Sequence, residues 1–299
     1  MKSFCIATAL AIVAASLAPP VASAASIILN EYNAVSSTKH LDTDDFGGSL
    51  KEDTYFGRIQ GNGNNWFELV VIEDNLDMRN WTLDWSYSTD ANNFGSGVLT
   101  LTNDLLWSNL RSGTILTFGE YNAADPTKTT PAPTDTSFDR LGGDWWINVR
   151  SDSTQYVTTM GTITEASIPT PLPAGEFSVN NDAWQLTIKD SLSNIIYGPA
   201  GEGVYTNGGI NSNEVYKLEF PSAVATLADW QGIVPTNTNF NDGTSSSFGA
   251  PNVWTTSSVM FVQDLSPIQA VPEPATWLLT LVGGGLTGAA VRRRRCQQA

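Results

Sequence analysis

The chain has 299 residues, with 15 basic and 30 acidic side chains and a formal net charge of −15. Such an acidic chain repels nucleic-acid backbones and anionic membrane surfaces, which argues against a nucleic-acid partner. The two cysteines, Cys5 and Cys296, both lie in terminal segments. The segment between them therefore has neither a disulfide nor a thiol nucleophile.

The first 24 residues have the features of a secretory signal peptide. Lys2 precedes an apolar run over residues 4–17, which is shorter than the roughly 20 residues of a membrane-spanning helix. Ala22 and Ala24 place small residues at the −3 and −1 positions of a cleavage site. We predict that residues 1–24 are removed on export. The alternative is a short membrane anchor that stays attached.

Residues 266–299 form a stalk followed by a second targeting segment. The order is Pro272, Glu273 and Pro274, then an apolar run over residues 275–291. The run is closed by four arginines, Arg292, Arg293, Arg294 and Arg295. The positive-inside rule keeps these arginines in the cytoplasm. We therefore expect a single transmembrane helix and a precursor anchored in the inner membrane.

This order of elements resembles the PEP-CTERM sorting signal of Gram-negative bacteria. The resemblance rests on Pro272-Glu273-Pro274, the Gly-rich apolar run and the arginine cluster. It implies processing by an exosortase, a membrane-embedded protease that cuts near the Pro-Glu-Pro sequence. The mature protein would then reach the cell surface or the extracellular matrix. Such proteins usually accompany exopolysaccharide and biofilm, so exopolysaccharide and surface proteins are the expected partners.

The segment over residues 25–265 is expected to fold as one domain. Without Lys2, the four tail arginines and Glu273, 10 basic and 29 acidic residues remain, a net charge of −19. Short apolar runs recur between turn residues, and in Trp81-Thr82-Leu83-Asp84-Trp85-Ser86-Tyr87 they alternate cleanly with polar positions. This texture predicts an all-β fold, an immunoglobulin-like antiparallel β-sandwich. The expected strands lie near residues 26–32, 66–72, 81–87, 97–101, 114–118, 145–149, 183–188, 215–220 and 258–262.

Two proline-rich segments, residues 122–139 and 168–175, are expected to be loops within that domain rather than domain boundaries. Apart from residues 258–262, the stretch over 240–270 carries little strand signal.

Residues 26–253 also resemble a lamin-tail domain, with insertions. Its motifs match the opening Asn30-Glu31, the Trp66-Phe67-Glu68-Leu69 strand and the closing Ser247-Phe248-Gly249-Ala250-Pro251-Asn252. Asn80 departs from the glycine usual in that family, and Arg111-Ser112-Gly113 replaces a Pro-Gly turn. The resemblance implies an immunoglobulin-like sandwich that serves as a binding or scaffold module.

Residues for familiar catalytic machinery are scarce. His40 is the only histidine, no Gly-x-Ser-x-Gly sequence occurs, and residues 36–39 match Ser-x-x-Lys without its partner motifs. A zinc site is excluded for lack of His and Cys ligands. We therefore expect a non-catalytic protein. One alternative is a secreted carbohydrate-active hydrolase, because carboxylate catalysis needs only two acids. Another is a structural coat protein without a specific ligand.

Two weaker candidate sites remain, and neither implies an organic cofactor. Asp42, Asp44 and Asp45 gather hard oxygen ligands before a glycine turn, a pattern suited to calcium. Residues 139–144 are a second, weaker candidate for a calcium site. Trp145 and Trp146 are adjacent, so a strand there would expose one of them beside Asp144. We expect this pair to contact a glycan.

Overall fold

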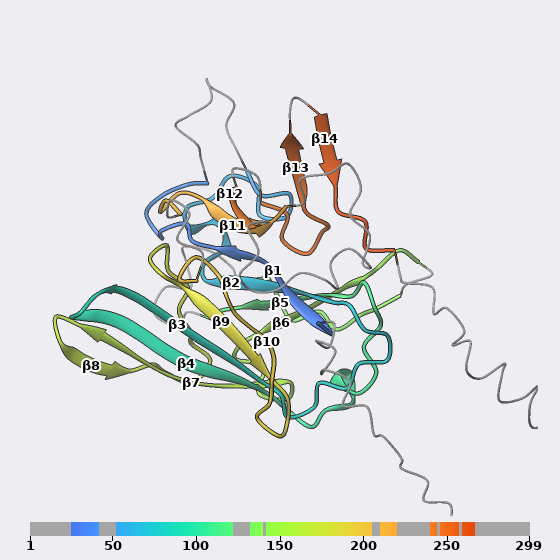
Figure 1. The fold of residues 1–299 in the computed structure, drawn as a ribbon, viewed down its shortest axis with the longest axis horizontal. Helices are drawn as coiled ribbons and strands as arrows, with labels where there is room; N and C mark the ends of the chain where they lie inside the picture. Colours follow the sequence, from blue (N-terminus) through green and yellow to red (C-terminus); the bar gives the residue numbers. More distant parts are fainter. Residues whose placement is uncertain are drawn as a thin grey trace, which may run out of the picture.

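The computed structural model describes residues 25–41, 52–121, 132–139, 142–204, 210–219, 240–243, 246–256 and 259–266. They form two six-stranded sheets that pack face to face, and a separate two-stranded hairpin beside the first sheet (Figure 1). All strand pairs are antiparallel except β5 with β6. The predicted all-β antiparallel sandwich is therefore confirmed, with one parallel pair added.

The first sheet has the order β12 (Phe240–Gly243), β11 (Val215–Leu218), β1 (Ile27–Asn33), β2 (Trp66–Val71), β5 (Ile115–Gly119) and β6 (Trp146–Arg150). The second has the order β10 (Ile195–Ala200), β9 (Gln185–Lys189), β3 (Thr82–Asp90), β4 (Asn93–Leu101), β7 (Val157–Glu165) and β8 (Ile168–Pro171). The hairpin is β13 (Val253–Thr256) with β14 (Val259–Val262), and two short 3₁₀ turns cover Gly61–Gly63 and Leu105–Trp107.

The main core lies between the two sheets and is rich in aromatic side chains. Leu83 and Trp85 of β3 are buried, as the alternation of that strand predicts. Aromatic contacts join the layers: the ring centroids of Tyr32 and Trp184 are 4.4 Å apart, and those of Phe67 and Trp184 are 6.0 Å apart. Offset and tilted ring pairs of this kind add to the stabilisation from apolar burial.

The first sheet is covered on its second face as well. Every residue of β1, β2 and β5 is buried. A smaller apolar cluster is formed on that side by Val35, Leu41, Trp66, Ala132, Val215 and Phe248. Its members outside the strands come from the segments before β2, before β6 and after β12. This loop layer over the first sheet contains the candidate site.

Several strands depart from the sequence-based expectations. The predicted loop over 168–175 begins with β8, no strand was expected at β7, and β12 and β13 lie in the stretch over 240–270 that carries little strand signal. Strand β8 tolerates Pro169 and Pro171 because it is an edge strand. The backbone N–H of Leu172 donates to the carbonyl of Gly161 at 2.9 Å. By alternation, the two proline nitrogens point away from β7.

The two predicted targeting segments, residues 1–24 and 266–299, fall almost wholly outside the described residues, of which Ser266 is the last. Among the described residues, no helix has the length and apolar character needed to cross a bilayer. The expected transmembrane helix over 275–291 lies beyond them.

Candidate functional site

A row of polar side chains crosses the first sheet beneath the loop layer. Lys217 pairs with Glu31, Glu31 with Glu68, Glu68 with Thr117, and Thr117 with Asn148. Directly paired residues share one face of a sheet. All five members of this polar row are at most 2% exposed. Because buried charged groups are costly without partners, the row requires a dense set of hydrogen bonds.

Residues 246–252, here called the strap, supply many of those hydrogen bonds. The backbone N–H of Gly249 donates to Oε2 of Glu68 at 2.9 Å. Ser247 Oγ lies 2.8 Å from Oε2 of Glu31. From β1, the side-chain amide of Asn30 donates to Oε1 of Glu68 at 2.6 Å. The strap is thus held to the sheet through two buried carboxyl groups.

Asn252, at the end of the strap, fixes the direction of one proton. Its side-chain N–H₂ donates to the carbonyls of Asn30 and Leu218 at 3.2 and 3.0 Å, so its Oδ1 is an acceptor. Ser247 Oγ lies 2.9 Å from that Oδ1 as well as beside Glu31. A hydroxyl has one proton to donate. Both contacts are satisfied when Glu31 is protonated and donates to Ser247, which then donates to Asn252.

The electrostatic surroundings agree with a protonated Glu31. Burial raises the pKa of Glu31 to about 7, with a further upward contribution from Asp53 and a downward one from Lys217. Burial also raises the pKa of Glu68 well above its ordinary value, and Glu31 raises it further whenever Glu31 is ionised. The folded protein therefore disfavours charge on both carboxyl groups at the same time.

Asp53 ties the other end of the strap to the loop before β2. Its Oδ1 accepts hydrogen bonds from the backbone N–H groups of Tyr55 and Phe56 at 2.7 and 2.9 Å. Its Oδ2 accepts from the hydroxyl of Ser246 and from the backbone N–H of Phe248, the latter at 3.3 Å. The carboxylate is 1% exposed, so it acts as an internal link between two loops.

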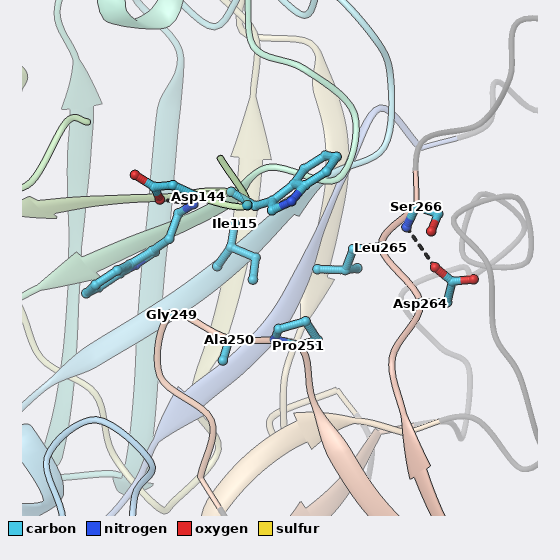
Figure 2. A pocket seen from close by; sticks show the side chains of 11 residues that line it. Ile115, Asp144, Gly249, Ala250, Pro251, Asp264, Leu265 and Ser266 are labelled. Carbon is cyan, nitrogen blue, oxygen red and sulfur yellow. Dashed lines mark hydrogen bonds between the residues drawn. The ribbon is translucent and has the colours of Figure 1, made fainter. Parts of the chain in front are cut away.

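A groove of about 500 Å³ opens beside the strap. Its walls are residues 143–146 before and at the start of β6, residues 249–251 of the strap, and residues 264–266 after β14, and Ile115 also lines it. Figure 2 shows Asp144 and Asp264 on different sides of this groove, with residues 249–251 along another side.

Trp146 forms a wall that is anchored in the scaffold. Its indole N–H donates to Oγ1 of Thr117 at 2.8 Å, and its ring packs against Tyr55 and Phe248 with centroids 5.3 and 5.5 Å away. Gly249, at φ +72°, rests on the indole, since an added Cβ would lie 2.6 Å from the ring. Any side chain at this position would push the strap away from the groove.

Trp145 borders the groove close to residues 264–266. A Cβ added to Gly113 would lie 3.3 Å from the Trp145 ring and would clash with the carbonyl of Leu265. Both tryptophans are half-buried and both line the groove. The expectation that they face opposite sides of a strand does not apply, because β6 begins only at Trp146.

The charged groups at the groove are acidic. Asp144 accepts hydrogen bonds from the backbone N–H of Trp146 at 3.3 Å and from the hydroxyl of Ser137 at 3.1 Å. Asp264 accepts one from the backbone N–H of Ser266 at 2.8 Å, drawn in Figure 2. Among the described residues lining the groove, these two carboxylates are the charged side chains. The groove therefore combines aromatic walls with negative charge.

The other predicted site residues lie elsewhere. Asp42, Asp44 and Asp45 fall outside the described residues, so the calcium site stays a prediction. Within the described ranges, no group of three or more His, Cys, Asp or Glu side chains is arranged to hold a metal ion. In the lesser candidate, Asp139 Oδ1 accepts the backbone N–H of Gly142 at 3.0 Å. His40 forms an isolated bridge with Gln60 and does not line the groove.

The sequence indicates the tryptophans but not the rest of the site. The strap carries only a motif of the lamin-tail resemblance, and residues 264–266 lie where the domain is expected to end and the stalk to begin. One signal for the polar row was available: Glu68 interrupts an otherwise apolar strand, and Glu31 follows the apolar run Ile27-Ile28-Leu29 in another. A charged residue inside a buried strand indicates a specific partner across the fold.

Comparison with known proteins gives one match. The family model described as the PEP-CTERM protein-sorting motif matches residues 270–295. No curated protein and no solved structure matches the chain, and the lamin-tail resemblance stays a prediction. The chain thus carries a PEP-CTERM protein-sorting motif, the mark of an exported protein processed by an exosortase-type membrane enzyme.

Proposed function

We propose that this protein is a non-catalytic component of the cell surface or extracellular matrix that binds polysaccharide in the groove. The observation that carries the proposal is the pair Trp145 and Trp146 on the walls of one groove of about 500 Å³. The sorting motif supports the location, because it sends the domain to the compartment where exopolysaccharide is found.

The shape and chemistry of the groove suit a sugar. Ligand sites of roughly 300–1,000 Å³ with aromatic walls and a few polar groups are typical of small-molecule recognition. A sugar ring presents C–H groups that pack on an indole, and hydroxyls that donate to carboxylates. Trp146 is fixed by Thr117 and Phe248, so the groove wall is ordered before a ligand binds.

A secreted hydrolase is the second candidate, because Asp144 and Asp264 both border the groove. Glycoside hydrolysis uses two carboxyl groups, one of them protonated as the general acid. Here each carboxylate is held by a backbone N–H donor, so both can orient sugar hydroxyls without taking part in a reaction.

The test is calorimetric titration of the exported protein, purified from producing cells, with polysaccharide from the same cells. We expect saturable binding that falls by about tenfold or more in Trp145→Ala, the size typical of a central aromatic contact. Phe94→Ala is the control, since Phe94 is exposed on the second sheet. Absence of saturable binding would overturn the proposal. Release of new reducing ends during incubation would establish the hydrolase instead.

A further inference from the structure

We infer that the groove selects a polysaccharide bearing free amino groups, over its N-acetylated form and over uronate polymers. This inference rests on the proposed polysaccharide-binding function and narrows it to one class of ligand.

The first argument is charge. Asp144 and Asp264 lie on different sides of the groove (Figure 2), and no described residue lining it is Lys or Arg. The segment over residues 25–270 carries a net charge of −19, which adds to the negative potential. A cleft of one sign concentrates ligands of the opposite sign and repels those of the same sign. Uronate chains are therefore disfavoured, and protonated amino sugars are favoured.

The second argument is the aromatic wall. A cation held over the face of an aromatic ring is attracted by the ring quadrupole, and Trp gives the strongest interaction of this kind. Trp145 and Trp146 both border the same groove as the carboxylates. An ammonium group on a sugar can thus meet an indole face while the two carboxylates supply the surrounding negative charge, whereas an N-acetyl group offers no positive charge.

The third argument is hydrogen-bonding capacity. A carboxylate has about four lone-pair sites. Asp144 uses its oxygens for one backbone and one hydroxyl donor, and Asp264 for the backbone donor of Ser266. Acceptor sites therefore remain on both side chains for the three N–H groups of an ammonium ion.

The experiment compares three oligosaccharides of equal length with the exported protein at mildly acidic pH. The probes are a fully deacetylated chito-oligosaccharide, its N-acetylated counterpart and an oligouronate. The variants are Asp144→Asn, Asp264→Asn and the double substitution. Glu165→Gln is the control, because it removes one negative charge from an exposed position on β7 of the second sheet.

We expect the deacetylated chain to bind at least tenfold more tightly than the acetylated one at low salt. Each Asn substitution should reduce that preference by about two- to fivefold, which is the effect expected from losing one exposed ion pair. Added salt should also reduce the preference, because it screens the charges. Equal affinity for the two chito-oligosaccharides, or preference for the uronate, would overturn the inference while leaving polysaccharide binding intact. Failure to bind any probe or the native polysaccharide would overturn both.

Discussion

At the scale of single residues, the buried carboxyl groups under the strap link the stability of the fold to pH. Glu31 has an ordinary pKa of 4.5 and a folded-state pKa of about 7. Between these values the folded protein holds a proton that the unfolded chain releases, so the free energy of unfolding falls as pH rises. Glu68 contributes in the same direction. The exposed Asp90 has a lowered pKa and acts oppositely, only at more acidic pH.

We predict that Glu31→Gln flattens this pH dependence. Between pH 4.5 and about 7, the unfolding free energy of the parent protein should fall by roughly 1–3 kcal/mol more than that of the variant. Urea unfolding of both proteins at a series of pH values measures this difference in unfolding free energy. Lys217, Asp53 and Glu68 remain in the variant, but the pKa of Glu68 loses the upward contribution of the Glu31 charge. The reduced slope therefore reports Glu31 together with its coupling to Glu68. Glu165→Gln should leave the slope unchanged, and an unaltered slope in Glu31→Gln would contradict the assignment.

At the scale of secondary-structure elements, the second sheet ends in a strand that cannot readily accept another strand. The nitrogens of Pro169 and Pro171 point outward from β8, so this edge lacks two hydrogen-bond donors. Unpaired strand edges favour association between chains, and proline is one protection against it.

Replacing both prolines by valine should therefore promote self-association. Pro169→Val with Pro171→Val adds two outward N–H groups to the edge, and the average mass measured by light scattering should rise with concentration. Stability should change by less than about 1 kcal/mol. Thr170→Val is the matched control, because it makes β8 more apolar without adding an outward donor. The explanation fails if control and double variant associate equally.

The elements also show what the sequence could and could not predict. Strand β3 was predictable because alternate residues, such as Leu83 and Trp85, are buried against one core. Strand β8 was not, because its pairing with β7 overrides the local signal of two prolines. The groove joins segments more than 100 residues apart in the chain, and no local pattern encodes that meeting. Only the tryptophan pair, Glu31 and Glu68 pointed toward the site.

At the scale of the whole molecule, the folded domain and the sorting motif have separate tasks. We predict that alanine substitution of Pro272, Glu273 and Pro274 leaves a full-length, membrane-bound precursor, because the residues at the cleavage site are lost while the apolar run and arginines remain. Fractionation with immunoblotting measures the shift in location and mass. Gln269→Ala, just before the motif, should be processed as the parent is. Normal processing of the triple variant would contradict the role of this sequence.

The position of the groove also decides how the molecule carries mechanical load. Ser266 lines the groove, and the sorting motif begins at residue 270. Four residues span at most about 15 Å when extended. If the groove binds a polymer while the chain is held by its C-terminal end, tension passes from the groove walls, Trp146 of β6 and the strap, across to residues 264–266. The load then crosses one edge of the first sheet, and the six strands of the second sheet stay outside its path.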